Sequence, residues 1–311
     1  MEATSRRGGR RGGRRAARTA ALLLVAAAAG CYDGAFLDLA CDRQGTCPNG
    51  TTTDTSTGAS SSTTDGGPTL EAFRVDTITI ADPHFYYQIA DTCTDVTDQL
   101  ELAIASEVAD GALNLVLLFD HADPAAATVG LTFTEAICVL GTEQTSCGFK
   151  DADTFIPVSA SNSSESPCDV VTPGTTNPAY ASAGVANVPP PICFASPRGP
   201  VVLPAIGALP PITFEVAQVA ASYGSGAAPV DGLVDGILAG YMPASKAMTL
   251  TGEIKGIPFE LWSSIAGSGA SCNIDPMNPL DDTDADPDPN VIERGVWFYF
   301  NFTATRVDWI Q

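Results

Sequence analysis

The sequence predicts a mainly β protein: an antiparallel β-sandwich or jelly-roll-like domain with a few short helices and long disulfide-tethered loops. Two observations predict this class. Several short segments between residues 70 and 311 are continuously apolar or alternate between apolar and polar side chains, as strands do. Helix-like stretches are scattered among them without a regular strand–helix–strand alternation, which favours antiparallel pairing.

Three segments carry the strand pattern most clearly. Residues 113–119 form a short apolar run suited to a buried strand. Residues 212–217 alternate as in a half-buried strand, and residues 296–302 place Val and Phe on one face and Trp, Tyr and Asn on the other. Further strands are expected at residues 73–80, 128–133 and 155–159. The stretch from Cys147 to Pro211 is rich in Pro, Ser and Gly and predicts long loops.

Three short helices are expected between the strands. In residues 95–109 apolar side chains recur every four positions, and Gly111 follows as a plausible C-cap. In residues 231–242 apolar residues and glycines each recur on one side of a helix, with the glycines suited to close packing on a sheet. Residues 258–266 begin with a proline and stop at Gly267, which is typical helix punctuation.

The first 30 residues have the three parts of an export signal: seven arginines, an apolar stretch, and small residues before a cysteine. The apolar stretch is shorter than the roughly 20 residues that span a bilayer, so cleavage is expected. Residues 28–31, Ala-Ala-Gly-Cys, resemble a bacterial lipobox with Ala28 where Leu is usual, which implies acylation of Cys31. The alternatives are an ordinary cleaved signal before an unmodified Cys31 and an Arg-rich organelle transit peptide.

Composition divides the chain into four parts. Residues 1–30 are expected to be the signal peptide, and residues 31–50 are expected to form a lipid-anchored segment that contains cysteines. Residues 51–69 consist almost wholly of Thr, Ser, Gly and Asp and are expected to be a disordered stalk, because they cannot bury a core. Residues 70–311 are apolar and aromatic enough to form a globular β-rich domain.

Loss of the signal peptide leaves a strongly acidic chain. It has 8 Lys and Arg residues against 35 Asp and Glu residues, a net charge of −27. Such a chain repels phosphate backbones and anionic membrane surfaces, so nucleic-acid binding is not expected. Contact with the membrane is expected through the N-terminal lipid, and no motif indicates a particular protein or glycan partner.

The cysteines fit an oxidising compartment. The eight cysteines beyond Cys31 suit four disulfides, and none of them forms the C-x-x-C pair that is typical of metal and redox sites. Proximity along the chain favours pairing Cys41 with Cys47, Cys138 with Cys147 and Cys168 with Cys193, which leaves Cys93 for Cys272.

No catalytic motif stands out. The mature chain has two histidines, His84 and His121, each expected just past a strand end, where a histidine is usually solvated. The patterns G-x-S-x-G, S-x-x-K and H-E-x-x-H do not occur in it, so neither a serine hydrolase nor a simple zinc hydrolase is indicated. A pair of carboxylates for glycoside hydrolysis stays open, because their roles depend on a separation that sequence does not give.

One acidic segment suggests a cofactor. Its oxygen-bearing side chains recur at the ligand positions of a calcium loop: Asp282, Asp284, Asp286, Asp288, Asn290 and Glu293. Pro287 stands where such loops have glycine, and no helix is expected on either side. The alternative is a solvated acidic loop, and calcium is the one cofactor that the sequence suggests.

The order of lipobox, cysteine-bearing start, Thr/Ser stalk and acidic β-rich domain resembles predicted cell-envelope lipoproteins of the myxobacterial type. The motifs that carry this resemblance lie in the first 70 or so residues, and they imply a location in the cell envelope. Tyr32 is not the Asp that retains lipoproteins in the inner membrane of enteric bacteria, which favours the outer membrane. We expect a non-enzymatic binding or structural module; the alternative is a secreted hydrolase with a carboxylate-based active site.

Overall fold

The computed structural model describes residues 70–89, 92–141, 145–150, 157–168, 186–206, 209–254, 257–265 and 283–310, without the side chains of residues 88, 89, 92, 93, 253, 254 and 257–259. These residues all belong to the compact unit Thr64–Gln311. The expected signal peptide, Cys31, anchored segment and stalk lie outside them. Within the described ranges, none of the helices has the length and hydrophobicity that a membrane span requires.

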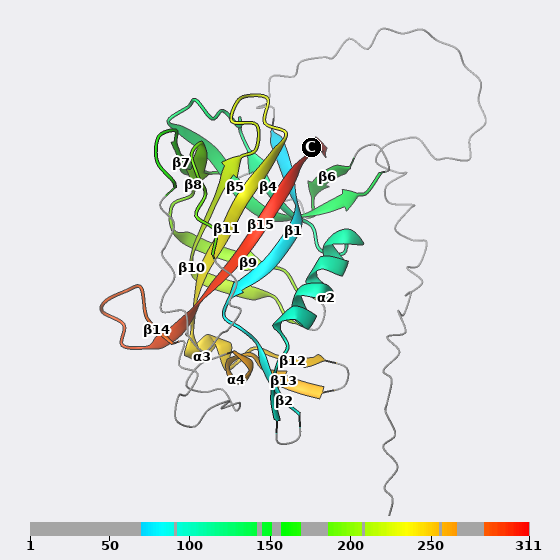
Figure 1. The fold of residues 1–311 in the computed structure, drawn as a ribbon, viewed down its shortest axis with the longest axis vertical. Helices are drawn as coiled ribbons and strands as arrows, with labels where there is room; N and C mark the ends of the chain where they lie inside the picture. Colours follow the sequence, from blue (N-terminus) through cyan, green and yellow to red (C-terminus); the bar gives the residue numbers. More distant parts are fainter. Residues whose placement is uncertain are drawn as a thin grey trace, which may run out of the picture. The chain divides into compact units, whose positions relative to one another are not determined.

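The main sheet is antiparallel and closes on itself into an eight-stranded barrel (Figure 1). Each strand of the ring pairs with the next, and the last pairs back with the first. In ring order the strands are β1 (Glu71–Asp82), β4 (Leu115–Phe119), β5 (Thr128–Val139), β7 (Val158–Ser163), β8 (Cys193–Ala195), β10 (Ile212–Tyr223), β11 (Gly232–Pro243) and β15 (Arg294–Ile310).

The predicted mainly β, antiparallel class is confirmed, but the strands do not divide clearly into the two sheets of a sandwich or jelly roll. Strand β1 pairs with both β4 and β15, and β5 pairs with both β4 and β7. Closure of this kind removes the free edges of the sheet. The alternation of apolar and polar residues along a strand cannot predict that the sheet closes into a barrel, because a sandwich and a barrel both bury one face of every strand.

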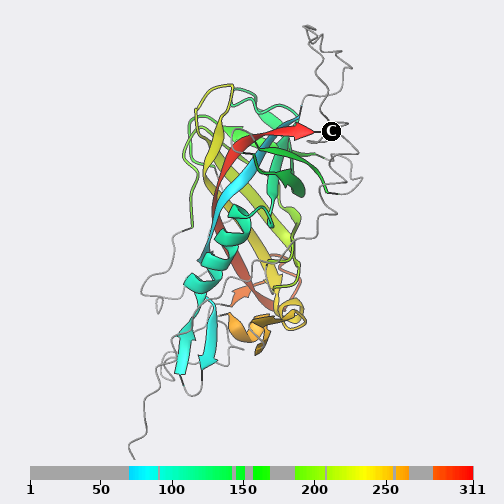
Figure 2. The same cartoon turned by 90° about the vertical axis from the view of Figure 1, so that its right-hand side faces the viewer.

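Smaller elements surround the ring. Helix α2 (Thr97–Ala109) lies along β1, and the short elements β2, β12, β13, α3 and α4 gather at the end of the barrel away from β6 and the C-terminus (Figures 1 and 2). The remaining elements are β2 (Tyr86–Ile89), β3 (Thr92–Asp95), β6 (Ser146–Phe149), β9 (Gly199–Leu203), β12 (Thr251–Ile254), β13 (Ile257–Glu260), β14 (Asp284–Ala285), α3 (Ala244–Ala247) and α4 (Leu261–Ser264).

The interior of the barrel is a packed hydrophobic core. Phe73, Phe119, Phe194, Phe214 and Phe298 are each 0% exposed. Phe119 meets Phe73 and Phe194 edge to face, with ring centroids 5.5 and 5.1 Å apart. The rings of Phe214 and Phe298 lie 5.4 Å apart. Large side chains from several strands therefore fill the space that the ring encloses.

The strands predicted at residues 73–80, 128–133, 212–217 and 296–302 are confirmed as parts of β1, β5, β10 and β15. The strand predicted at residues 113–119 is confirmed over Leu115–Phe119, which form β4. The strand expected at residues 155–159 begins instead at Val158. The region predicted to be long loops contains the end of β6 and, within its described residues, the short strands β7, β8 and β9. Its prolines do not prevent these strands, because β8 and β9 span only three and five residues.

Two of the helix predictions hold in part. Helix α2 ends at Ala109 as expected but begins at Thr97, because Asp95 is the last residue of β3. Gly111 follows the helix with a φ of +72°, which glycine adopts at little cost. The segment 258–266 is helical only over Leu261–Ser264, because its first residues belong to β13. The proline at 258 fits a short hairpin as well as a helix start.

The helix predicted at residues 231–242 is wrong, because this segment is strand β11. The strand is buried on both faces over most of its length, so its apolar residues do not alternate. Its glycines accommodate aromatic rings: a Cβ at Gly236 would lie 2.5 Å from the ring of Phe302, and one at Gly240 would lie 2.4 Å from the ring of Phe214. A strand buried on both sides can imitate the spacing of a helix.

Candidate functional site

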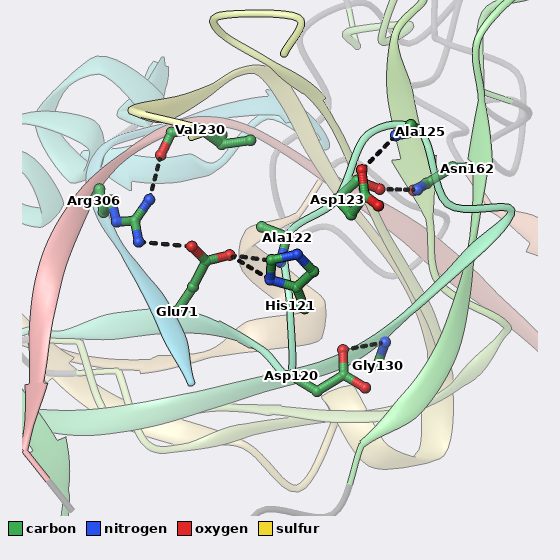
Figure 3. A network of polar contacts seen from close by, with 10 residues as sticks. All are labelled: Glu71, Asp120, His121, Ala122, Asp123, Ala125, Gly130, Asn162, Val230 and Arg306. Atoms are coloured by element: carbon green, nitrogen blue, oxygen red, sulfur yellow. Dashed lines mark hydrogen bonds and ion pairs between the residues drawn. The ribbon is translucent and has the colours of Figure 1, made fainter. Parts of the chain in front are cut away.

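A network of charged and polar residues lies where β1 and β4 meet the end of β15 (Figure 3). Glu71 is the first residue of β1, and Arg306 lies near the end of β15. Residues 120–127 connect β4 to β5 and supply Asp120, His121 and Asp123. Within the described residues this network brings together several titratable side chains from different elements, and it is the candidate site.

Glu71 is the hub of the network. Its side chain is 13% exposed, and its Oε1 accepts a hydrogen bond from Arg306 Nη2 at 2.6 Å. Its Oε2 accepts the backbone N–H of Ala122 at 2.6 Å and lies 3.8 Å from His121 Nδ1. Arg306 Nη1 also donates to the carbonyl of Val230 at 3.2 Å. The carboxylate thus fastens the β4–β5 connection to two strands of the barrel.

A second group of contacts holds the same connection from β7 and β10. Asn162 Nδ2 donates to the carbonyls of Asp123 and Ala126 at 2.9 and 2.8 Å. Tyr223 Oη donates to Asn162 Oδ1 at 2.9 Å. Burial raises the pKa of Tyr223 and outweighs the hydrogen bond with Asn162, which lowers it, and the charge of Asp123 adds to the increase. The phenol therefore stays protonated and acts as a hydrogen-bond donor.

The other two carboxylates of the network also accept backbone N–H groups. Asp120 Oδ1 accepts from Gly130, and Asp123 Oδ1 accepts from Ala125, each at 2.9 Å. The side chain of His121 is 72% exposed, as its position past a strand end predicts. These charged acceptors fix the β4–β5 connection in place.

Comparison with family models, with curated proteins and with solved structures gave no match.

His84 is buried, although the sequence predicts a solvated histidine at this position. Its side chain is only 7% exposed. It lies between β1 and the β2–β3 hairpin, where its Nδ1 is hydrogen-bonded to Asp95 Oδ2 at 2.6 Å. Asp95 Oδ1 accepts the backbone N–H of Thr97 at 2.9 Å, at the start of α2. Sequence reasoning missed this pair because the two residues lie on different elements.

The His84–Asp95 contact predicts a pH effect. Burial raises the pKa of Asp95, but hydrogen bonds from His84 and Thr97 outweigh it, so the pKa lies below its ordinary value of 3.8. A carboxyl whose pKa is depressed by folding contributes stability above its unfolded pKa, and that contribution is lost as the pH falls through the folded pKa. We expect Asp95→Asn to lower the urea midpoint at pH 6, and the difference from wild type to shrink below about pH 4.

Urea unfolding at pH 6 and pH 3 checks this expectation. The matched control is Glu165→Gln, at an exposed carboxyl on the surface, which should shift neither midpoint. If the difference in urea midpoint between wild type and Asp95→Asn stays constant from pH 6 to pH 3, the predicted pH effect is wrong.

The predicted calcium ligands that the structure describes take part in hydrogen bonds with backbone groups. Asp284 accepts the N–H of Trp297 at 3.2 Å, and Glu293 accepts the N–H of Ser245 at 2.6 Å. Asp286 accepts from Asp288 at 2.8 Å, and Asp288 accepts from Asn290 at 2.9 Å. The remaining predicted ligand, Asp282, lies outside the described residues.

These hydrogen bonds lower the pKa of Asp288 and of Glu293. In the described part of the chain, no three His, Cys, Asp or Glu side chains are grouped so as to hold a metal ion. Calcium binding stays a prediction from the sequence. It would raise the melting temperature in millimolar Ca²⁺ over that in chelator, and Asp284→Asn with Asp286→Asn would remove the increase.

Two of the predicted disulfides are confirmed. Cys138 is bonded to Cys147 and Cys168 to Cys193. The remaining candidates, the side chain of Cys93 together with Cys41, Cys47 and Cys272, lie outside what the structure describes.

Sequence reasoning missed Glu71, Asn162, Tyr223 and Arg306. Each belongs to a strand whose presence was predicted at least in part, but no local pattern marks these positions as partners. They meet because β1, β7, β10 and β15 are members of one ring.

Proposed function

We propose that this chain is a non-enzymatic binding or structural module of the cell envelope, attached to the membrane through an acylated Cys31. The observation that carries the proposal is how the carboxylates of the candidate site are used. Glu71, Asp120 and Asp123 each accept a backbone N–H group of the β4–β5 connection or of β5 itself. A general acid, base or nucleophile has to reach its substrate, whereas these groups hold the chain in place.

Two further features support a module that acts with its outer surface. The barrel interior is filled by apolar side chains, which leaves the outside and the loops as the contact surface. The two disulfides in the described part of the chain suit an oxidising compartment outside the cytoplasm. A rigid, cross-linked barrel on a stalk is a suitable form for a module that spaces or presents a surface.

A hydrolase is the second candidate, because Glu71, Asp120, Asp123 and His121 do lie in one network. Incubation of the mature chain with peptidoglycan, lipopolysaccharide and chromogenic esters and glycosides separates the two candidates. We expect no turnover above the no-protein blank. Turnover that Glu71→Gln or Asp120→Asn abolishes without a change in melting temperature would overturn the proposal in favour of the hydrolase. Glu215→Gln, at an exposed carboxylate paired with Lys246, is the matched control.

The anchor is tested separately. The wild-type chain expressed in a bacterium should enter the detergent phase, and the Cys31→Ser variant should remain in the aqueous phase with an unchanged melting temperature. Mass spectrometry of the N-terminal peptide identifies the lipid. Equal partitioning of the two proteins would exclude the acyl anchor while leaving the question of enzymatic activity to the first experiment.

A further inference from the structure

Strand β6 forms a flap on the outside of the barrel. It pairs antiparallel with the end of β5, where Cys138 lies opposite Cys147, and parallel with the last residues of β15, Asp308–Ile310. The flap comprises residues 145–149. The flap stands outside the ring of eight strands, because β1 closes directly on β15 and the ring is complete without it.

The flap covers apolar surface. Ala72 of β1 and Val116 and Leu118 of β4 point away from the barrel interior and are 1%, 0% and 0% exposed. They form a cluster with Cys147, and Phe149 and the end of β15 pack against that cluster. Phe149 meets Trp309 edge to face, with ring centroids 4.9 Å apart. Movement of the flap would expose this cluster to water.

The Cys138–Cys147 bond is the covalent tie of the flap. Cys138 is partly exposed, whereas Cys147 is 1% exposed. In the other disulfide that the structure describes, Cys168 and Cys193 are 3% and 0% exposed. Exchange with an external thiol requires access to one of the two sulfur atoms, so the flap disulfide is the more open of these two to attack.

The ion pair next to the flap contributes little to holding it closed. Lys150, just past the flap, and Glu135 form an ion pair at 2.6 Å, with side chains 50% and 28% exposed, and exposed pairs of this kind contribute little. The backbone N–H of Asp308 donates to the carbonyl of Thr145 at 3.0 Å. The backbone of β6 pairs with four residues of β5 and with three of β15. Because this strand spans only four residues and stands outside the ring, it opens locally more readily than the barrel unfolds.

We propose that β6 is a redox-controlled flap, locked by the Cys138–Cys147 disulfide and opened by a dithiol reductant to expose the apolar cluster on β1 and β4. A thiolate of the reductant attacks Cys138 Sγ, the bond to Cys147 Sγ breaks, and Cys147 leaves as a thiolate that takes up a proton. The second thiol of the reductant resolves the mixed disulfide and releases Cys138. Two electrons and two protons pass to the protein, and the reductant becomes a disulfide.

To test this, the folded mature protein is reduced with dithiothreitol for increasing times and then alkylated with iodoacetamide. Peptide mass spectrometry identifies the alkylated cysteines. We expect Cys138 and Cys147 to be alkylated before Cys168 and Cys193. Hydrogen exchange on the same samples should become about tenfold faster or more in residues 145–149 and 307–310, while β10 and β11 stay protected. A dye that binds exposed apolar surface should gain fluorescence.

The control is the double variant Cys138→Ser/Cys147→Ser, which should show the fast exchange of the flap without reductant and no further change with it. If the variant does not fold, the time course on wild type decides alone. Reduction of Cys168–Cys193 first would overturn the proposal. So would complete reduction of Cys138–Cys147 with unchanged exchange in the flap, or exchange that rises equally in β10 and β11.

Discussion

Replacement of Phe298 by Ala is expected to lower the free energy of unfolding by about 3–5 kcal/mol. Phe298 is 0% exposed in the hydrophobic core, and its ring lies within 5.4 to 6.4 Å of the rings of Phe85, Phe214 and Phe300. Truncation removes the burial of a whole aromatic ring and leaves a cavity that surrounding strands cannot fill, because the ring of strands is closed. The melting temperature should fall by about 10 °C.

Urea unfolding and calorimetry measure this effect, and Val202→Ala is the matched control. Val202 lies on β9 with 56% of its surface exposed, so its truncation should change the free energy of unfolding by less than about 0.5 kcal/mol. Benzene should raise the melting temperature of Phe298→Ala and leave that of wild type unchanged, because an apolar cavity binds small apolar molecules. A wild-type barrel stabilised by benzene to the same degree would contradict a filled interior.

Replacement of Gly240 by Ala is expected to cost about 1–3 kcal/mol through overpacking. The added methyl group would lie 2.4 Å from Cγ of Phe214, whose ring is fully buried and packed against Phe298 and Phe300. The ring cannot move aside without displacing its neighbours. The loss should appear as a lower urea midpoint with an unchanged slope, which indicates a change in stability alone.

Gly199→Ala is the control for the effect of a glycine-to-alanine change in a strand where the added methyl group meets no neighbour. Nothing lies within 4 Å of a Cβ at Gly199, which is also in a strand, so the variant should be as stable as wild type or slightly more stable. The Phe214→Leu substitution should cost less in the Gly240→Ala background than in wild type, because it removes the atoms that clash. Additive losses in the double variant would show that the contact between positions 214 and 240 is not the cause.

The contacts of the candidate site join residues that are far apart in the chain, so the sequence alone could not predict them. The sequence places His121 just past the end of a predicted strand, but Glu71 and Arg306 are 235 positions apart. Their ion pair exists because β1 and β15 are neighbours in the barrel. Asn162 and Tyr223 join the network for the same reason, through the pairings of β7 and β10 with β8.

The mainly β class, most of the strands, helix α2 and two disulfides could be predicted from the sequence, because each depends on residues close together in the chain. Alternation, a glycine after a helix and short separations between cysteines are local signals. Only the folded chain reveals that β11 is a strand, that His84 is buried and that the sheet closes into a barrel. These outcomes depend on burial from both faces and on pairing between distant strands, and neither leaves a periodic trace in the sequence.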